Sequence, residues 1–235
     1  MKAVWRSDVG LQRKSNQDAY LVLPGEYPLY AVADGMGGHL GGDTASSMAV
    51  AGLKAALAGV LPTEQAIASS YDCISADIYH RQAHDRKLSG MGTTLTMLWE
   101  TPQQVIMGHV GDSRAFLLRQ GALTQLSTDH SLVSELLRTG VLDEEAARAY
   151  PYRNVITRAV GTDPSVQCDT AVFDKQPGDR WLLCSDGLSE YFTQAALQQA
   201  LQGDDMNGIA DQLLATALAG GGHDNITLIL LEVAP

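Results

Sequence analysis

The sequence predicts an α+β fold in which antiparallel β-sheets are covered by helices. Short apolar or β-rich runs recur along most of the chain. Longer stretches with helical periodicity stand in its first third and near its end. Because strands and helices do not alternate one for one, as they do in βαβ units, antiparallel sheets are favoured over parallel ones.

The predicted strands are short runs bounded by turn residues. Pro102-Gln103 and Gln120-Gly121 separate neighbouring runs where hairpin turns are expected. The middle strands are therefore expected to form an antiparallel meander. In chain order the runs are Ala19–Leu23, Leu29–Ala33, Thr94–Trp99, Val105–Val110, Ala115–Leu118, Val166–Phe173, Arg180–Cys184 and Ile226–Val233.

Apolar residues at three- and four-residue steps predict helices that pack one face on a core. The first such stripe runs from Ala45 to Val60, the second from Ile67 to Ile78 and the third from Met206 to Ala217. No internal repeat or linker divides the chain. Residues 1–235 are therefore expected to form a single domain.

The amino-acid composition limits the kinds of partner that the chain is expected to bind. The 235 residues are 45% apolar and 18% charged, which suits a chain with a large core. Sixteen basic and 27 acidic residues give a net charge of −11, which disfavours nucleic acid and anionic membrane surfaces as partners. No apolar run exceeds five residues, whereas a membrane span needs about 20. The first ten residues also lack the apolar stretch of a secretion signal.

The cysteines indicate a reducing compartment. Cys73, Cys168 and Cys184 lie far apart and form neither a C-x-x-C pair nor an even-numbered framework. Cys184 stands in the apolar run WLLCSD and is expected to be buried and inert. A cytoplasmic location is therefore predicted.

Aspartates stand at the ends of apolar runs throughout the chain. Asp34, Asp112 and Asp186 each close such a run, and Asp18 and Asp224 each open one. A carboxylate at the end of a buried strand is costly to desolvate unless a cation or hydrogen-bond donors compensate. Few Lys or Arg residues stand beside these acids, so the pattern favours a cluster around divalent metal. Any single one of them is explained as well by a turn or N-cap role.

The types of residue in this pattern indicate which metal ion is expected. Oxygen ligands, without His or Cys at metal-ligand spacing, favour Mg²⁺ or Mn²⁺ over Zn²⁺. Glycines adjoin the acids, as in Asp34-Gly35-Met36-Gly37-Gly38, and allow the close backbone approach through which a carbonyl can join the ligands.

Six short motifs follow one another along the chain. They are Arg13-Lys14-Ser15-Asn16-Gln17-Asp18, Ala33-Asp34-Gly35-Met36-Gly37-Gly38, Gly92-Thr93-Thr94, Gly111-Asp112-Ser113-Arg114, Ser185-Asp186-Gly187 and Asp224-Asn225-Ile226-Thr227. As an ordered set they resemble the metal-dependent protein phosphatases of type 2C, and most of all the compact bacterial branch of that family. The resemblance extends from about Asp8 to Val233.

This resemblance implies a four-layer α-β-β-α sandwich with two central antiparallel sheets. It implies a Ser/Thr phosphoprotein phosphatase in which a water or hydroxide, bridged by two Mn²⁺ or Mg²⁺ ions, attacks the phosphorus in line without a phosphoenzyme. Its substrates would be phosphoproteins, and its opposing partner a eukaryotic-like Ser/Thr kinase. We expect a monomer with no nucleic-acid or membrane partner.

The resemblance also implies the ligands of the two core ions. Asp34 matches the residue that bridges them, and the carbonyl of Gly35 matches a ligand to one of them. Asp186 and Asp224 match the residues that complete the other.

Three further positions carry implied roles. Asp18, next to Gln17, falls where the family holds metal-bound waters or a metal. Asp112, together with Asp186, matches the position of a third, weaker metal in bacterial members. Arg13 matches the phosphate-binding arginine, whose guanidinium donates two parallel hydrogen bonds, so Lys should substitute poorly there.

Residues 128–165 resemble a flap beside the active site of bacterial members. Val133, Leu136 and Leu137 are spaced for a short amphipathic helix within it. This segment is expected to shape substrate preference rather than chemistry.

Three positions depart from the family pattern. Met36 replaces a histidine proposed as general acid in animal members, Glu190 stands where an Asp ligand is common, and Tyr150 where many bacterial members have His.

Other classes of function fit less well. A catalytically silent phosphoprotein-binding module would lack a core acid, and none is lacking. His223-Asp224 resembles half of an HD-type metal site, but no other histidine set completes it. Cysteine-based phosphatases need an Arg six residues after the Cys, and the chain has none there; it also lacks a G-x-x-x-x-G-K-[ST] loop.

Overall fold

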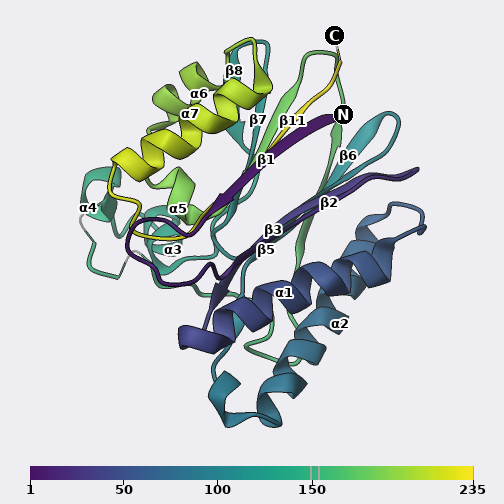
Figure 1. The fold of residues 1–235 in the computed structure, drawn as a ribbon, viewed down its shortest axis with the longest axis vertical. Coiled ribbons are helices and arrows are strands. Elements are labelled where there is room, and N and C mark those ends of the chain that lie inside the picture. Colours follow the sequence, from purple (N-terminus) through teal and green to yellow (C-terminus); the bar gives the residue numbers. More distant parts are fainter. Residues whose placement is uncertain (149, 153, 235) are drawn as a thin grey trace.

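The computed structural model describes residues 1–148, 150–152 and 154–234, apart from the side chains of residues 38–40, 144 and 148. Across these residues the strands form two antiparallel sheets that face each other, and helices cover the outer face of each (Figure 1). The predicted α-β-β-α sandwich is confirmed. None of the helices in these ranges has the length and apolar character that a membrane crossing requires.

The first sheet, called sheet A, contains both ends of the chain. Its order is β1 (Lys2–Asp8), β11 (Ile226–Glu232), β10 (Arg180–Cys184), β7 (Arg114–Arg119) and β8 (Ala122–Gln125). Its outer face packs on α5 (Asp186–Ser189), α6 (Gln194–Ala200) and α7 (Met206–Ala219) through a buried cluster that includes Leu213 and Leu228.

The second sheet, sheet B, has the order β2 (Asp18–Leu23), β3 (Leu29–Met36), β5 (Leu95–Glu100), β6 (Gln104–Val110) and β9 (Asp169–Asp174), with β4 (Gly92–Thr93) paired to the end of β3. A second cluster, including Leu53 and Ile78, packs it against α1 (Gly38–Leu57) and α2 (Glu64–Ala83). A 3₁₀ turn, η1 (Arg86–Leu88), follows α2.

A third cluster fills the space between the sheets. Trp181 and Ile229 of sheet A and Leu98 of sheet B are at most 1% exposed within it. The strands β5 and β10 are therefore buried on both faces, which explains their nearly uniform apolar sequences.

The prediction of a continuous meander is wrong. β5 and β6 form one hairpin in sheet B, whereas β7 and β8 form another in sheet A. The chain crosses between the sheets at Gly111, which has φ 109°, a value at which side-chain-bearing residues are strained. Both predicted turns, at Pro102-Gln103 and Gln120-Gly121, do join these hairpins.

Several element boundaries also differ from the prediction. β1 and β8 are edge strands that the sequence analysis missed. α1 ends at Leu57, so Val60 lies outside the helix and is exposed. The run that begins at Val166 becomes a strand only at Asp169. Cys184 is buried as predicted.

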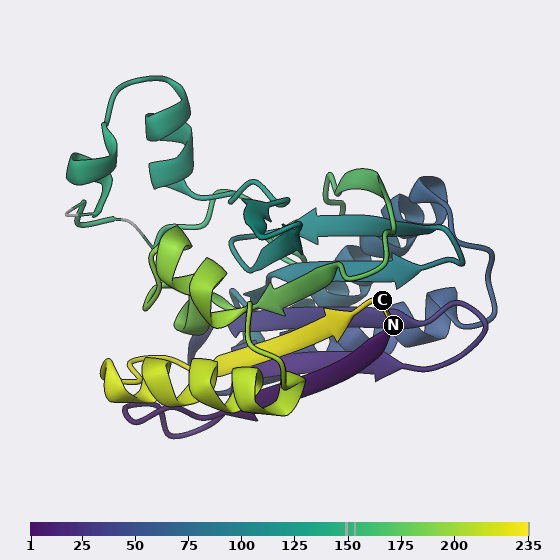
Figure 2. The same ribbon diagram turned by 90° about the horizontal axis from the view of Figure 1, so that it is seen from above.

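The flap-like segment projects from the sandwich (Figure 2). It contains α3 (Leu132–Arg138), which includes the predicted amphipathic residues, and α4 (Glu144–Arg148). No residue of α3 is buried, so this helix does not cover the core. Bridges from Ser131 to Ile156 and from Thr93 to Val160 fasten the base of the segment.

Candidate active site

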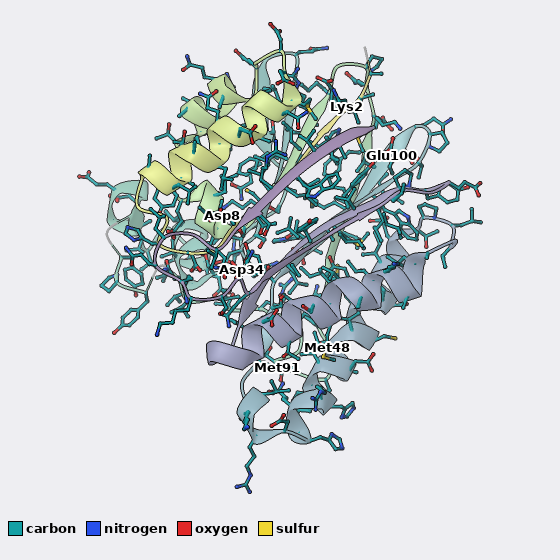
Figure 3. All side chains as sticks on the ribbon, viewed as in Figure 1. Lys2, Asp8, Asp34, Met48, Met91 and Glu100 are labelled. Atoms are coloured by element: carbon teal, nitrogen blue, oxygen red, sulfur yellow. The ribbon has the colours of Figure 1, made fainter. Side chains whose placement is uncertain are left out.

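The acids of the sequence pattern gather at one end of the sandwich. Asp18 opens β2 and lies opposite Asp34 of β3 in the strand register. Asp112 follows β6, Asp186 follows β10, and Asp224 precedes β11. Figure 3 shows Asp34 near Asp8 at this end, whereas Lys2 and Glu100 lie at the other.

Asp34 is central to the cluster. Desolvation of its carboxylate raises its pKa well above the usual range. Other carboxylates raise it further, namely those of Asp18, Asp186, Asp112 and Asp224. The backbone around Asp34 is fixed, because its N–H donates to Thr94 Oγ1 over 2.8 Å and its carbonyl accepts from Thr94 N over 2.9 Å. Asp34 thus lies where the charges of the four other aspartates converge.

Asp18 and Asp186 each leave a carboxylate oxygen unsatisfied. Oδ1 of both residues is buried without a hydrogen-bond partner. Burial, and then nearby acids, raise the pKa of Asp18 to about 7. Burial, and then Glu190 and Asp224, raise the pKa of Asp186 to about 6. Buried acceptors without donors are rare in folded proteins and indicate a missing ligand or ion.

Asp112 lies at the crossing between the sheets and is 8% exposed. Burial, followed by the charges of Asp186 and Asp129, raises its pKa to about 7. Arg114 lowers the pKa of Asp112 only in part, because its guanidinium is engaged by Asp129, with Nη2 2.6 Å from Oδ2.

Arg13 supplies a cation at the cluster. Its Nη2 donates to Asp224 Oδ2 over 2.6 Å, and the two side chains are 49% and 34% exposed. The loop from Val9 to Gln17 brings Arg13 to the cluster although more than two hundred residues separate it from Asp224. The structure thus joins every predicted site residue at one end of the molecule.

Glycine is required at position 35 because the surrounding backbone packs closely on it, not because of its own φ and ψ angles. A Cβ at Gly35 would collide with the backbone of Gly42 at the start of α1 and stand 2.7 Å from the Gln17 carbonyl oxygen. The absence of a side chain lets α1, the Arg13 loop and β3 meet behind Asp34.

The acids have local partners as they stand. In the described part of the chain, no group of three or more His, Cys, Asp or Glu side chains is arranged to hold a metal ion. Asp224 is turned toward Arg13, and Asp18 Oδ2 accepts from Ser185 Oγ over 2.8 Å. Separate partners of this kind reduce the mutual repulsion between the carboxylates.

Sequence reasoning missed the neutral residues that hold the site. Ser185 Oγ donates to Asp18 and accepts from Thr227 N over 3.0 Å, which ties β10 and β11 to β2. Asn225 is 3% exposed and bonds three backbone groups of the Arg13 loop. Both stand inside the quoted motifs, yet no signal in the sequence names their partners.

His109 is a core residue, as its place in a strand suggests. It is 0% exposed; its Nε2 lies 3.0 Å from the carbonyl oxygen of Thr128 and its Nδ1 2.9 Å from Thr96 Oγ1. Its ring stacks on His130, with centroids 4.8 Å apart. Neither ring nitrogen faces the acids.

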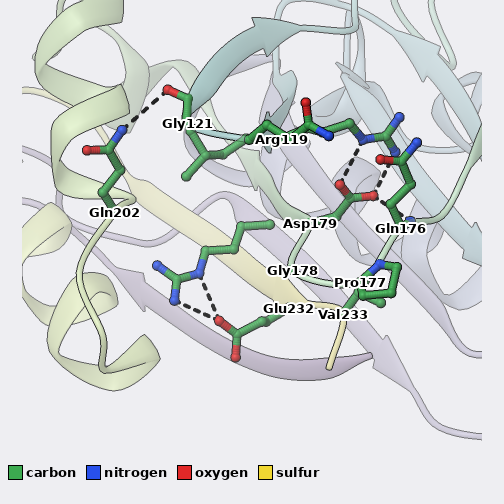
Figure 4. A pocket seen from close by; sticks show the side chains of 12 residues that line it. Arg119, Gly121, Gln176, Pro177, Gly178, Asp179, Gln202, Glu232 and Val233 are labelled. Atoms are coloured by element: carbon green, nitrogen blue, oxygen red, sulfur yellow. Dashed lines mark hydrogen bonds and ion pairs between the residues drawn. The ribbon is translucent and has the colours of Figure 1, made fainter. Parts of the chain in front are cut away.

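A cavity of about 560 Å³ lies at the opposite end of the sandwich, beside the starts of β8 and β10 and the end of β11 (Figure 4). The charged groups that line it are paired: Arg119 with Asp179 and Arg180 with Glu232, at 2.7 Å in each case. It therefore presents no unpaired charge for a phosphate, in contrast to the acid cluster with Arg13.

The family model described as protein phosphatase 2C matches residues 12–219. The chain belongs to this family. The phosphatase is 38% identical to the serine/threonine phosphatase stp of Listeria innocua over 99% of this chain and 96% of the relative. These matches confirm the compact bacterial branch and the predicted enzyme class, a protein-serine/threonine phosphatase.

Solved structures of relatives share the fold of this phosphatase. The serine/threonine phosphatase Stp1 from Staphylococcus aureus superimposes with a TM-score of 0.94 at 31% identity, covering 100% of this chain and 95% of that one. The catalytic domain of the phosphatase PstP in complex with two manganese ions gives a TM-score of 0.89 at 34% identity, with 100% and 98% covered. The fold class is thereby confirmed a second time.

Proposed function

We propose that this phosphatase hydrolyses phosphoserine and phosphothreonine in phosphoproteins at the acid cluster, with two Mn²⁺ or Mg²⁺ ions bound there. The observation that carries the proposal is a cluster in which four aspartates act on the buried Asp34, two carboxylate oxygens are buried and unsatisfied, and Arg13 stands beside Asp224. Relatives bearing the name serine/threonine phosphatase, one of them solved with two manganese ions, support it.

The residues fit hard divalent ions. Every proposed ligand atom is an oxygen, which suits Mg²⁺ and Mn²⁺. Asp34 and the Gly35 carbonyl would hold one ion, and Asp34 with Asp186 and Asp224 the other. Asp18 would accept hydrogen bonds from water on these ions or bind one itself. Asp112 with Asp186 would hold a third, weaker ion.

When bound, such ions neutralise phosphoryl charge and lower the pKa of a water molecule, so that a nucleophile is available at neutral pH. Arg13 would orient the phosphoryl group by donating two parallel hydrogen bonds to its oxygens. To do so it would release Asp224. Because no side chain acts as nucleophile in this scheme, no phosphoenzyme forms.

The wider setting is also a proposal. A eukaryotic-like Ser/Thr kinase would supply the phosphoproteins, since hydrolysis of Ser/Thr phosphate opposes that transfer. The flap-like segment, residues 128–165, would select among substrates because it projects beside the fold and leaves the core intact. The free cysteines agree with a cytoplasmic location. We propose a monomer.

The test is hydrolysis of para-nitrophenyl phosphate and of matched phosphoserine, phosphothreonine and phosphotyrosine peptides, with and without Mn²⁺. We expect Mn²⁺-dependent release of phosphate from the Ser and Thr peptides, and its loss on chelation. Asp34→Asn should lower kcat/KM by at least about 100-fold, as removal of a group that stabilises transition-state charge does. Calorimetry should show weaker Mn²⁺ binding in the same variant.

Asp204→Asn is the matched control, because Asp204 is exposed and outside the cluster. Activity that survives chelation, or an Asp34→Asn variant as active as Asp204→Asn, would reject the mechanism. Tight phosphopeptide binding without turnover would instead favour the silent binding module.

A further inference from the structure

One buried side chain bonds both ends of the loop from Val9 to Gln17. This loop carries Arg13, yet it has no regular secondary structure between β1 and β2. The side chain of Arg13 is half exposed, and its one bond within the described residues is to Asp224. The position of its guanidinium therefore depends on what fixes the ends of the loop.

Asn225 bonds both ends of the loop, although the Gln17 carbonyl also accepts from Gly35 N over 3.1 Å and from Ser46 Oγ over 2.6 Å. Its Nδ2 donates to the carbonyl oxygens of Val9 over 2.9 Å and Ser15 over 3.0 Å. Its Oδ1 accepts from Gln17 N over 2.7 Å. Both N–H donors and the oxygen of the side-chain amide are therefore bonded to the loop. Because Asn225 is only 3% exposed, water cannot easily replace these bonds.

The backbone before Asn225 supports the entry of the same loop. Leu11 N donates to the Gly222 carbonyl over 2.8 Å. Gly10, with φ 76°, packs so closely on the Asp224 carbonyl that a Cβ there would collide with it. Asn225 adjoins Asp224, so one turn of the chain holds the acid partner of Arg13 and the anchor of the Arg13 loop.

We infer that Asn225 is a positioning residue for phosphate binding, acting through Arg13. The inference rests on the proposed function, because it assigns the phosphate to Arg13. Within the described residues the side chain of Asn225 bonds neither Arg13 nor the acids. Its backbone N–H donates to Asp224 Oδ1 over 2.8 Å, a bond that an alanine at this position retains. Its effect should therefore appear in phosphate affinity, through the placement of a guanidinium that must reach two phosphoryl oxygens at once.

The experiment is a double-mutant cycle of Asn225→Ala and Arg13→Ala, read with para-nitrophenyl phosphate and with inorganic phosphate as inhibitor. Asn225→Ala should raise the KM and the phosphate inhibition constant about 10- to 100-fold, the range for losing hydrogen bonds to a charged group, with kcat changed less than about threefold. In the Arg13→Ala background the same substitution should change KM by less than about twofold.

Two further measurements do not depend on hydrolysis of a substrate. In metal-free protein, amide exchange at Gln17 should accelerate in Asn225→Ala, while exchange at Thr227, bonded to Ser185, should not. Mn²⁺ affinity measured by calorimetry should not fall below that of the unmodified chain. Asn207→Ala is the matched control, since Asn207 is exposed on α7 and contacts Arg6 rather than the loop.

Equal KM effects of Asn225→Ala in both backgrounds would overturn the inference, as would a loss of Mn²⁺ affinity with phosphate inhibition unchanged. If the alanine variant does not fold, Asn225→Asp retains the size and the bond from Gln17 but removes the two donors, and the same cycle decides. Absence of Mn²⁺-dependent hydrolysis in the unmodified chain would refute the proposed function. The exchange at Gln17 would then still decide whether Asn225 holds the loop.

Discussion

At the scale of single residues, the acid cluster is defined by what its oxygens lack. Oδ1 of Asp18 and of Asp186 have no donor, and the pKa of both carboxyls is raised because burial and neighbouring acids disfavour their charged forms. An aspartate in a turn or N-cap role has its oxygens bonded to backbone N–H groups. Asp186 accepts one such bond, from the backbone N–H of Gly187, so a turn role explains part of its environment. The cation-binding interpretation accounts for the Oδ1 atoms that stay unbonded in both residues.

Arg13 has two competing uses in this site. Its bond to Asp224 occupies an oxygen that the proposed ion needs, whereas its other use is to bind phosphate. Arg13→Ala should therefore weaken binding of inorganic phosphate and strengthen Mn²⁺ binding. The gain in Mn²⁺ affinity should be up to about fivefold, since an ion pair this exposed contributes about 0–1 kcal/mol. Calorimetry with each ligand measures both effects.

Arg13→Lys distinguishes geometry from charge. It should retain the competition with Mn²⁺ but not the phosphate affinity, because an ammonium cannot donate two parallel bonds. Unchanged Mn²⁺ affinity in Arg13→Ala would show that the pair with Asp224 does not compete with the ion.

At the scale of elements, local pattern predicted most strands and the long helices, but not their assignment to sheets. β6 and β7 are both mostly buried, so both sequences are mainly apolar although the strands lie in different sheets. β1 shows one buried residue, Val4, and β8 one, Leu123. Both strands interleave polar residues such as Lys2, Arg6 and Gln125 with the apolar ones, so neither forms a continuous apolar run, unlike the edge strand β2.

Part of the candidate site could likewise be predicted from the sequence, and part could not. The acids could be predicted because charge at the end of an apolar run is conspicuous and costly. Ser185 and Asn225 could not, because a neutral polar residue reveals its role only through its partners. Asp18, the acceptor for Ser185, and Val9, an acceptor for Asn225, are each more than 160 residues away in sequence. The pairing of Asp18 with Asp34 likewise depends on strand register, which requires the fold.

β6 carries a buried histidine that makes folding sensitive to acid. Burial, and then the neighbouring His130, lower the pKa of His109 to about 4, against about 6.5 in an unfolded chain. As pH falls below 6.5, His109 binds a proton in the unfolded state but stays neutral in the folded state. The free energy of unfolding therefore decreases from about pH 6.5 down to pH 4. Between pH 7 and 5 this loss amounts to about 2 kcal/mol.

His109→Gln should remove this part of the acid sensitivity. The difference in unfolding free energy between pH 7 and 5, measured with urea, should shrink by about 2 kcal/mol relative to the unmodified chain. His80→Gln, at an exposed position, is the control and should leave the difference unchanged. An equal pH response in all three chains would contradict the assigned pKa.

At the scale of the whole molecule, the proposed ligands come from both sheets. Asp18 and Asp34 belong to sheet B, whereas Asp186 and Asp224 adjoin strands of sheet A. Bonds such as Ser185 to Asp18 already join the sheets at this end. An ion shared by these carboxylates would link the two halves of the sandwich, and it would bind the folded chain only, because the unfolded chain scatters its ligands over about two hundred residues.

Binding to the folded state alone raises stability by mass action. At 100 times its dissociation constant, one ion adds about 2.7 kcal/mol, which for a domain of this size raises the Tm by about 5–10 °C. We therefore expect chelation to lower the Tm by that amount and Mn²⁺ to restore it. Asp34→Asn should lose most of the response and Asp204→Asn none. A Tm that rises equally in both variants would show that Mn²⁺ binds elsewhere, because only the cluster distinguishes them.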